Sequence, residues 1–267
     1  WNYQLWDLHN IDALNAIVKS PNIRGFNVTL PHKTNIIPYL NFIAADAYRM
    51  QSVNTVICLP KKEEPLNQLR FLLQNLQLSL LELNSQIPPP SENDDSSEKK
   101  LNTEINTHYL IGFNTDILGF EDSVNSFNKP FNQAVIIGNG GSSKSVKQLL
   151  SNKGIPFLHF SRTPDYTSSV HSMAELQNRK PSANTLWVNT SPAGMLPNVN
   201  SMPDIPEFCI HPTDSLIDLI YNPEETKLMQ HFQQQGAQTR NGWIMLTSQA
   251  KHAWNLFQLS AKLSITE

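Results

Sequence analysis

The feature that most constrains the fold is a glycine-rich turn between an apolar run and a helix-like segment. The run QAVII, residues 133–137, has the composition of a buried parallel strand, and GNGGSS follows it directly. The next residues, SKSVKQLLSNK, predict a helix that ends at Gly154, because glycine is favoured just beyond a helix C-terminus. A strand, a glycine turn and a helix in this order are typical of a dinucleotide-binding unit.

Further apolar runs continue the alternation of strands and helices towards the C-terminus. Strands are expected at IPFLHF (155–160), TLWVN (185–189) and DSLIDLIY (214–221). A helix is expected from Asn222 to Gly236, since Asn222 would be its N-cap, Pro223 its first residue, and two glutamates would lie in its first turn. A closing helix is expected from about residue 241. This alternation predicts an α/β fold with a doubly wound parallel sheet.

Residues 59–109 differ in composition from the chain on either side of them. Leucines recur at helical spacing between residues 66 and 83, which predicts an amphipathic helix. Residues 84–108 contain no aromatic side chain, and a segment so poor in large apolar groups is expected to be a disordered linker. The segment is interpreted as an insertion, either passive or with a helix that binds a partner.

Composition and charge exclude several classes of function. The 267 residues carry a net charge of only −3, which gives no basis for binding nucleic acid. No run of about eighteen apolar residues predicts a membrane span. Cys58 and Cys209 lie far apart with no CxxC spacing, and the histidines show no ligand spacing, so neither a disulfide framework nor a metal site is predicted. Two reduced thiols favour a cytoplasmic protein.

The glycine turn and the end of the following strand together predict a particular cofactor. Glycines at 138, 140 and 141 let the backbone approach a pyrophosphate at the helix N-terminus, although the third position of the GxGxxG pattern is Ser143. A site for NAD would place an acidic residue after the next strand. The chain has Ser161-Arg162-Thr163 there, and a guanidinium can pair with a 2′-phosphate. NADP is therefore predicted over NAD.

The N-terminal part holds a lysine in an unusual setting. GFNVTLPHK, residues 25–33, predicts a strand from Phe26 to Leu30, a rigid turn at Pro31, and then Lys33. Two further segments, Val53-Asn54-Thr55 and Asn114-Thr115-Asp116, end β-like runs with small polar groups. Such groups suit a polyhydroxylated ligand, and turns with side-chain hydrogen bonds are the alternative.

Eight segments occur in one order: GFNVTLPHK, QSVNTV, GFNTDILGF, GNGGSS, SRT, VNTSPAGM, DLIYNP and NGWIMLTSQAKHAW. In these motifs the chain resembles the shikimate/quinate dehydrogenase family, from residue 1 to about 265 apart from the 59–109 insertion. That family begins with a strand and a serine-bearing loop that binds the substrate carboxylate, and neither is expected after Trp1. The resemblance implies two α/β domains. These are a substrate-binding domain, residues 1–117 completed by 241–267, and a Rossmann-like NADP-binding domain, residues 118–240.

The resemblance also implies roles for individual residues. The lysine of NVTxPxK and the aspartate of NTD form the family's catalytic pair, and they match Lys33 and Asp116. Positions that hold the hydroxyls and carboxylate of the substrate match Thr29, Asn54, Tyr221 and Gln249.

The residues that match NADP-binding positions lie in the glycine turn, after the next strand and in three later segments. They are Gly138, Asn139, Gly140, Gly141, Ser142, Ser161, Arg162, Thr163, Asn189, Thr190, Leu219 and Gly242. Of these, Leu219 and Gly242 match contacts to the nicotinamide end of the cofactor.

The expected reaction is the reversible, NADPH-dependent reduction of 3-dehydroshikimate to shikimate in aromatic amino-acid biosynthesis. A lysine near an aspartate can accept or relay the proton of the reacting hydroxyl. The alternatives are a quinate or quinate/shikimate dehydrogenase and a non-catalytic NADP-binding paralogue. A small-molecule substrate, no nucleic acid, no membrane, and a monomer or homodimer are expected.

Overall fold

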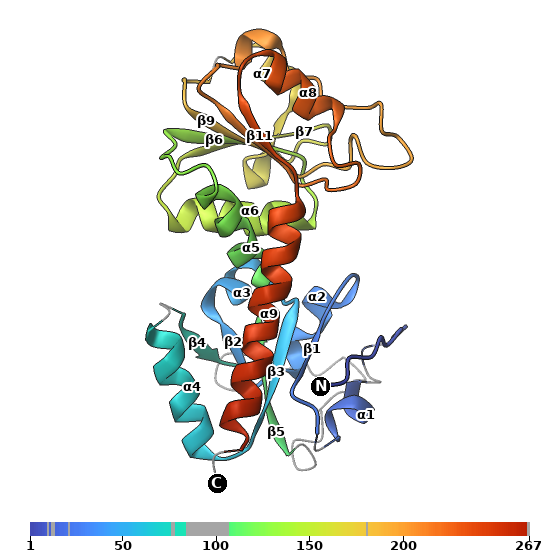
Figure 1. Cartoon of the computed structure of the whole chain (residues 1–267), viewed down its shortest axis with the longest axis vertical. Helices are drawn as coiled ribbons and strands as arrows, with labels where there is room; N and C mark the ends of the chain where they lie inside the picture. Colours follow the sequence, from blue (N-terminus) through green and yellow to red (C-terminus); the bar gives the residue numbers. More distant parts are fainter. Residues whose placement is uncertain are drawn as a thin grey trace. The chain divides into compact units, whose positions relative to one another are not determined.

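The computed structural model describes residues 1–9, 11, 14–20, 22–75, 78–83, 107–179 and 181–265. The chain divides into two compact units, Trp1–Thr115 with Ala253–Glu267, and Asp116–His252 (Figure 1). The boundary between Thr115 and Asp116 lies two residues before the one predicted after residue 117. The boundary between His252 and Ala253 falls inside the closing helix, α9 (Trp243–Leu263), whereas the prediction placed it before that helix.

The first unit is built on a mixed sheet with the strand order β1-β3-β5-β2-β4 in the described residues. β3 pairs antiparallel with both β1 and β5. β2 pairs parallel with β5, and β4 forms the other edge of the sheet, antiparallel to β2. The strands are β1 (Gly25–Asn27), β2 (Phe42–Ala44), β3 (Thr55–Pro60), β4 (Leu80–Glu82) and β5 (His108–Phe113). The helical segments are α1 (Leu14–Val18), α2 (His32–Asn35), η2 (Ile37–Tyr39), α3 (Ala45–Met50) and α4 (Glu63–Asn75).

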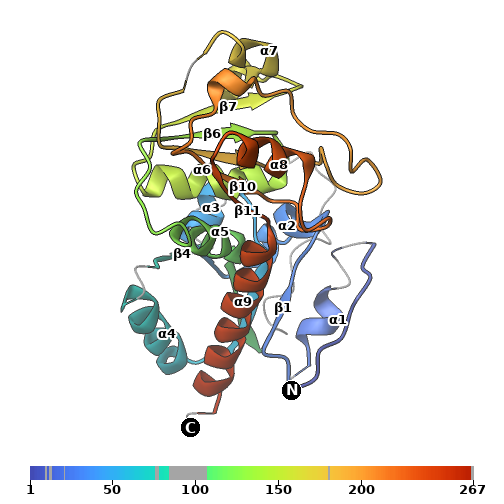
Figure 2. The same ribbon diagram turned by 45° about the horizontal axis from the view of Figure 1, so that its top comes forward.

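The last turns of α9 complete the core of this unit. Phe257 packs against Gly25 so closely that an added Cβ there would lie 2.5 Å from the ring, and Ser260 Oγ donates to the carbonyl of Cys58 at 2.7 Å. Both views show α1 at the β1 end of the sheet and α4 near β4 (Figures 1 and 2). Cys58 is fully buried in this core, and burial raises the pKa of its thiol to about 12.

Two sequence predictions in this unit were wrong in part. The leucine-rich helix ends at Asn75, and Leu80 lies in β4 opposite Ala44. Leucine spacing alone cannot distinguish a helix from a short strand. In the folded chain, β4 forms backbone hydrogen bonds with the edge of β2 that β5 leaves open. The linker predicted at 84–108 lies outside the described residues except for its last two, of which His108 begins β5.

The strand predicted from Phe26 to Leu30 ends at Asn27. Val28 N still donates to Asn54 O at 2.8 Å, but Thr29 and Leu30 then turn into solvent ahead of α2, and Leu30 is 76% exposed. Thr29 therefore follows the strand and does not share a strand face with Asn27.

The second unit contains a parallel sheet with the order β11-β10-β9-β6-β7-β8. α5 and α6 cover one face and α7 and α8 the other (Figure 1). The strands are β6 (Gln133–Ile137), β7 (Phe157–Ser161), β8 (His171–Ser172), β9 (Thr185–Asn189), β10 (Ser215–Asp218) and β11 (Gln238–Arg240). The helical segments are α5 (Thr115–Asn125), α6 (Gly141–Asn152), η3 (Tyr166–Ser168), α7 (Met173–Leu176), η4 (Glu207–Cys209) and α8 (Lys227–Gln234).

The predicted alternation of this half is confirmed in its main features. β6 and β9 have the predicted bounds, and Gly154 follows α6 with φ +65° as a C-terminal glycine should. β10, however, ends at Asp218, three residues before the predicted end.

The helix predicted from Asn222 begins instead at Lys227. Thr226 is its N-cap, because the Thr226 hydroxyl accepts from Met229 N at 3.2 Å and donates to Asp218 Oδ2 at 2.6 Å. This buried contact places the start of the helix after the Asn222-Pro223 turn, which its local sequence signals could not reveal. In the part of the chain described here, no helix combines the length and apolar character needed to cross a bilayer.

Candidate active site

The glycine turn between β6 and α6 has the geometry that a bound phosphate requires. Gly138 has φ +96°, and an added Cβ there would lie 2.7 Å from Ser191 N. Gly140 is the N-cap of α6, and Ser143 donates its side chain to Gly140 O at 2.7 Å. The small residue at the third motif position is therefore buried and closes the turn, as a third glycine would.

The first turn of α6 presents an exposed, unobstructed backbone. Asn139, Gly140, Gly141 and Ser142 are exposed, an added Cβ on Gly141 would meet nothing within 4 Å, and no acidic side chain lies in this turn. Amide N–H groups at a helix N-terminus attract anions. This end of α6 can therefore receive a pyrophosphate.

Hydrogen bonds from two further strands support the turn. Thr190 Oγ1 lies 2.9 Å from the carbonyl oxygens of both Ile137 and Gly138. His159 Nε2 lies 2.6 Å from Gly138 O. Burial lowers the pKa of His159, so the neutral imidazole donates its Nε2–H to that carbonyl. His159 was not predicted, although a histidine inside the apolar run FLHF was a visible signal.

The residues predicted to select NADP are the last residue of β7, Ser161, and the two that follow it, next to the glycine turn. Gly138 N donates to Phe160 O at 2.8 Å, which brings the ends of β6 and β7 together. Ser161 is buried, and its hydroxyl accepts from Thr163 N at 3.2 Å. Arg162 and Thr163 are exposed. A guanidinium at the end of the second strand of such a sheet can pair with a ribose 2′-phosphate.

A buried carboxyl, Asp218 at the end of β10, binds the end of β9 and the start of α8, and it was not predicted. Its Oδ1 accepts from Asn189 Nδ2 at 2.9 Å and Ile220 N at 3.2 Å, and its Oδ2 accepts from Thr226. Asn189 Oδ1 in turn accepts from Ser191 N at 3.0 Å and from its hydroxyl at 2.7 Å. Burial raises the pKa of Asp218, although the hydrogen bonds that its carboxylate accepts from Thr226, Ile220 and Asn189 act in the opposite direction.

Leu219 and Gly242, the predicted nicotinamide-end pair, are brought into contact. Leu219 N donates to Asn189 O at 3.0 Å, and Gly242 N donates to Ile220 O at 3.0 Å. A side chain at Gly242 would collide with the Leu219 carbonyl. All the predicted cofactor-binding residues therefore lie in the second unit, along or beside the carboxyl edge of its sheet.

In the first unit, three of the predicted substrate-site residues lie on neighbouring segments. Val28 N, beside Thr29, donates to Asn54 O at 2.8 Å, and Val53 N donates to Lys33 O at 2.8 Å. Lys33 is half-buried in α2, and Thr29 is exposed. The backbone of residues 53–54 thus holds both Thr29 and Lys33 near Asn54.

The Asn54 side chain is oriented by buried donors. Its Oδ1 accepts from Thr115 N at 2.8 Å, Thr115 Oγ1 at 3.2 Å and Thr55 Oγ1 at 3.0 Å. These donors fix the orientation of the amide, with Oδ1 turned towards Thr55 and Thr115.

The remaining predicted residues belong to the second unit. Asp116 is buried in the first turn of α5, Gln249 is half-buried in α9, and Tyr221 is 48% exposed with its ring 6.4 Å from that of Trp243. α5 and α9 pack tightly here, since an added Cβ on Gly119 would lie 3.0 Å from Gln249 N.

A parallel sheet with a glycine turn, an accessible helix N-terminus and an arginine after the second strand defines a dinucleotide-binding α/β protein. The chain is similar to the shikimate dehydrogenases, the family that its motifs resemble: residues 1–56 match the family described as the shikimate dehydrogenase substrate binding domain. Curated relatives extend this likeness over nearly the whole chain. A protein of Clostridium beijerinckii named shikimate dehydrogenase (NADP(+)) is 28% identical over 98% of this chain and 84% of its own length. One of the same name from a Nostoc species is 29% identical over 93% and 76%.

Solved structures of shikimate dehydrogenases share the fold of this chain. Shikimate dehydrogenase 1 from Peptoclostridium difficile is 27% identical with a TM-score of 0.60, over 95% of this chain and 81% of that one. A chorismate mutase/shikimate 5-dehydrogenase fusion protein from Clostridium acetobutylicum gives a TM-score of 0.67 at 23% identity, over 95% and 79%. The predicted α/β fold is therefore confirmed.

Proposed function

We propose that this protein is an NADP-dependent shikimate dehydrogenase that interconverts 3-dehydroshikimate and shikimate. The observation that carries the proposal is the placement of Arg162 after β7, beside the glycine turn, in a chain whose curated relatives are named shikimate dehydrogenase (NADP(+)). The first unit would be the substrate-binding domain and the second the NADP-binding domain.

The residues of the second unit fit a bound NADP. Gly138, Asn139, Gly140, Gly141 and Ser142 would hold the pyrophosphate, because Gly138 makes the turn and the four residues after it are exposed at the start of α6. The segment 161–163 would hold the 2′-phosphate. Asn189 and Thr190 would lie beside the cofactor, and Leu219 and Gly242 would contact its nicotinamide end. When bound, NADP supplies hydride transfer.

The substrate would be held by Thr29, Asn54, Tyr221 and Gln249. Asn54 would donate its Nδ2–H to a substrate oxygen, since its Oδ1 accepts from Thr115 and Thr55. Lys33 and Asp116 would handle the proton of the reacting hydroxyl, with the ammonium also able to stabilise negative charge that develops on the oxygen.

The rival substrates and the non-catalytic alternative are separated by one assay. The purified protein is given shikimate or quinate, each with NADP or NAD, and reduced cofactor is followed by absorbance. We expect the highest kcat/KM with shikimate and NADP. Faster turnover of quinate with NAD would make the protein a quinate dehydrogenase, and no turnover combined with NADP binding would make it a non-catalytic paralogue.

The proposal extends to the cellular setting. Cys58 and Cys209 are both buried and unpaired with each other, as is usual in a reducing compartment, so we place the enzyme in the cytoplasm. A monomer or a homodimer is expected, and sedimentation equilibrium distinguishes the two.

A further inference from the structure

The nine residues between β7 and β8 form a loop whose two ends lie side by side. β8 pairs parallel with β7, so that Phe160 faces His171 and Ser161 faces Ser172. Arg162 is the first residue of this loop. The residues on either side of it are joined by a hydrogen bond, because Thr163 N donates to the Ser161 hydroxyl. Whatever holds the far end of the loop therefore also limits the position of Arg162.

The middle of the loop is a compact turn. Asp165 and Val170 exchange two backbone hydrogen bonds, of 2.9 and 2.8 Å, and Val170 is fully buried. The Asp165 carboxylate accepts from Thr167 N at 3.2 Å and Thr167 Oγ1 at 2.6 Å. Hydrogen bonds to the charged carboxylate, first of all from Thr167, lower the pKa of Asp165.

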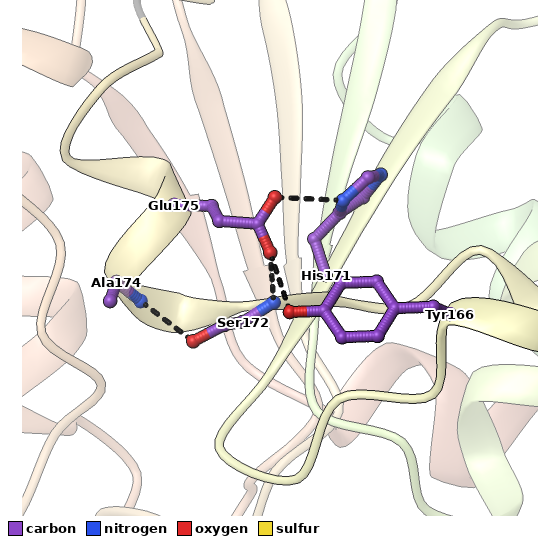
Figure 3. Close-up of polar contacts among 5 residues, drawn as sticks. All are labelled: Tyr166, His171, Ser172, Ala174 and Glu175. Carbon is purple, nitrogen blue, oxygen red and sulfur yellow. Dashed lines mark hydrogen bonds and ion pairs between the residues drawn. The ribbon is translucent and has the colours of Figure 1, made fainter.

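Glu175, in the short helix α7, ties this turn to β8 (Figure 3). Its Oε1 accepts from Tyr166 Oη at 3.0 Å and from Ser172 N at 3.1 Å, and its Oε2 lies 3.1 Å from His171 Nδ1. The hydrogen bond from Ser172 N is the main reason that the pKa of Glu175 is lowered. One carboxylate thus joins a residue of the loop to both residues of β8.

Ring contacts continue this connection into the core. The rings of Tyr166 and His171 lie 6.3 Å apart, edge to face, and those of His171 and the buried Phe160 lie 5.8 Å apart. The loop is therefore anchored to β7 both at its start, through Ser161, and at its far side, through Glu175 and His171.

We propose that Glu175 is a positioning residue for the cofactor site: it holds the 162–170 loop in one conformation and so prepares Arg162 to bind the 2′-phosphate of NADP. This inference rests on the proposed function. Fixing a charged side chain before binding reduces the entropy lost on binding. NAD lacks the 2′-phosphate, so loss of Glu175 weakens NADPH binding more than NADH binding.

The alternative role for Glu175 is purely structural. It completes the capping box of α7, with Ser172 as the N-cap, and such a cap stabilises a helix without affecting any ligand. A structural role alone would change both cofactor affinities together, or neither. The ratio of the two dissociation constants therefore distinguishes the two roles.

The test measures the dissociation constants of NADPH and NADH by cofactor fluorescence, without substrate, in four variants. Glu175→Ala removes the network, and Glu175→Gln is the conservative variant, whose amide oxygen can still accept from Tyr166 and Ser172. Arg162→Ala measures the full contribution of the guanidinium. Glu121→Ala is the matched control, because it removes the same atoms from a carboxylate of the same unit whose partner is Lys153 at 2.7 Å.

We expect Glu175→Ala to reduce the preference for NADPH about fivefold, Arg162→Ala to reduce it further, and Glu175→Gln to restore most of it. Glu121→Ala is expected to leave the ratio unchanged. A wild-type ratio in Glu175→Ala, alongside a reduced ratio in Arg162→Ala, would overturn the proposal.

If Glu175→Ala does not fold, Tyr166→Phe takes its place, since it removes only the hydroxyl that reaches Glu175. A shift of about twofold in the same direction is then expected, and no shift would reject the proposal. Cofactor binding is measured without substrate, so absence of shikimate turnover in the wild type would count against the proposed reaction alone.

Discussion

Asp218 Oδ1 and Asn189 Nδ2 lie 2.9 Å apart, at the ends of two adjacent parallel strands, β10 and β9. The same carboxyl group accepts from Ile220 N and the Thr226 hydroxyl. One buried side chain therefore links the end of β9 and the start of α8 to the residues that follow β10, which include Leu219.

Replacing Asp218 by alanine is expected to lower the free energy of unfolding by about 3 kcal/mol, because it leaves buried donors without their acceptor. NADPH binding should weaken as well, since Leu219 and Asn189 lose their common support. Urea unfolding and cofactor titration measure the two effects. Unchanged stability would show that water or a rearranged loop replaces the carboxylate.

Asp218→Asn tests the protonation of this group. Burial raises the pKa of Asp218 in the folded protein, so its stabilisation is complete below the ordinary carboxyl pKa and is lost as the pH rises through the folded pKa. The asparagine variant does not titrate there. We expect the wild type to lose stability relative to Asp218→Asn as the pH is raised from about 4.

Urea unfolding at a series of pH values measures this difference, and the exposed Asp204→Asn controls for the removal of one charge. A constant difference between the wild type and Asp218→Asn across the series would contradict the raised pKa.

Gly138→Ala is expected to be strongly destabilising, for two reasons that can be separated. The positive φ strains any other residue by about 1 kcal/mol, and the added Cβ would in addition lie 2.7 Å from Ser191 N. Gly154→Ala has only the strain, because its added Cβ meets nothing within 4 Å and its φ is +65°. Gly141→Ala has neither.

Thermal unfolding should rank the three variants, with Gly138→Ala the least stable, Gly154→Ala intermediate and Gly141→Ala close to the wild type. Equal losses at Gly138 and Gly154 would mean that the 191 segment moves aside at no cost.

Lys33→Ala and Asp116→Asn are each expected to reduce kcat for shikimate oxidation about 10²- to 10⁴-fold, the usual contribution of proton transfer. NADPH affinity should remain at the wild-type value, because neither residue belongs to the candidate cofactor site. Steady-state kinetics and cofactor fluorescence report the two quantities.

If the two side chains act in one step, the double variant should lose little more than the worse single variant. Additive losses would indicate separate roles, and wild-type turnover in Lys33→Ala would remove the catalytic assignment.

The second unit was the more predictable of the two. The bounds of β6 and β9 and the position of Gly154 follow from apolar runs and glycine chemistry, which act between near neighbours in the chain. The start of α8 was mispredicted because Thr226 is selected as N-cap by Asp218, a partner that lies eight residues upstream in a strand. A local capping signal at Asn222 cannot compete with a buried hydrogen bond.

The first unit shows the same limit in its sheet. Leucine spacing predicted one long helix, but Leu80 pairs with Ala44 across β2 and β4, a contact set by which edge of the sheet is open. The candidate residues Lys33 and Asn54 were identified from motifs, whereas the orientation of Asn54 depends on Thr115, 61 residues away.

Side-chain chemistry within a few residues made the glycine turn, the arginine after β7 and the main alternation of strands and helices in the second unit predictable, although α5, β8, α7 and β11 were not predicted. The contacts of His159, Asp218 and Glu175 are visible only in the folded chain. Their function depends on which donors and acceptors the sheet brings within about 3 Å. For Asp218 and Asn189 those partners stand 29 residues apart along the chain.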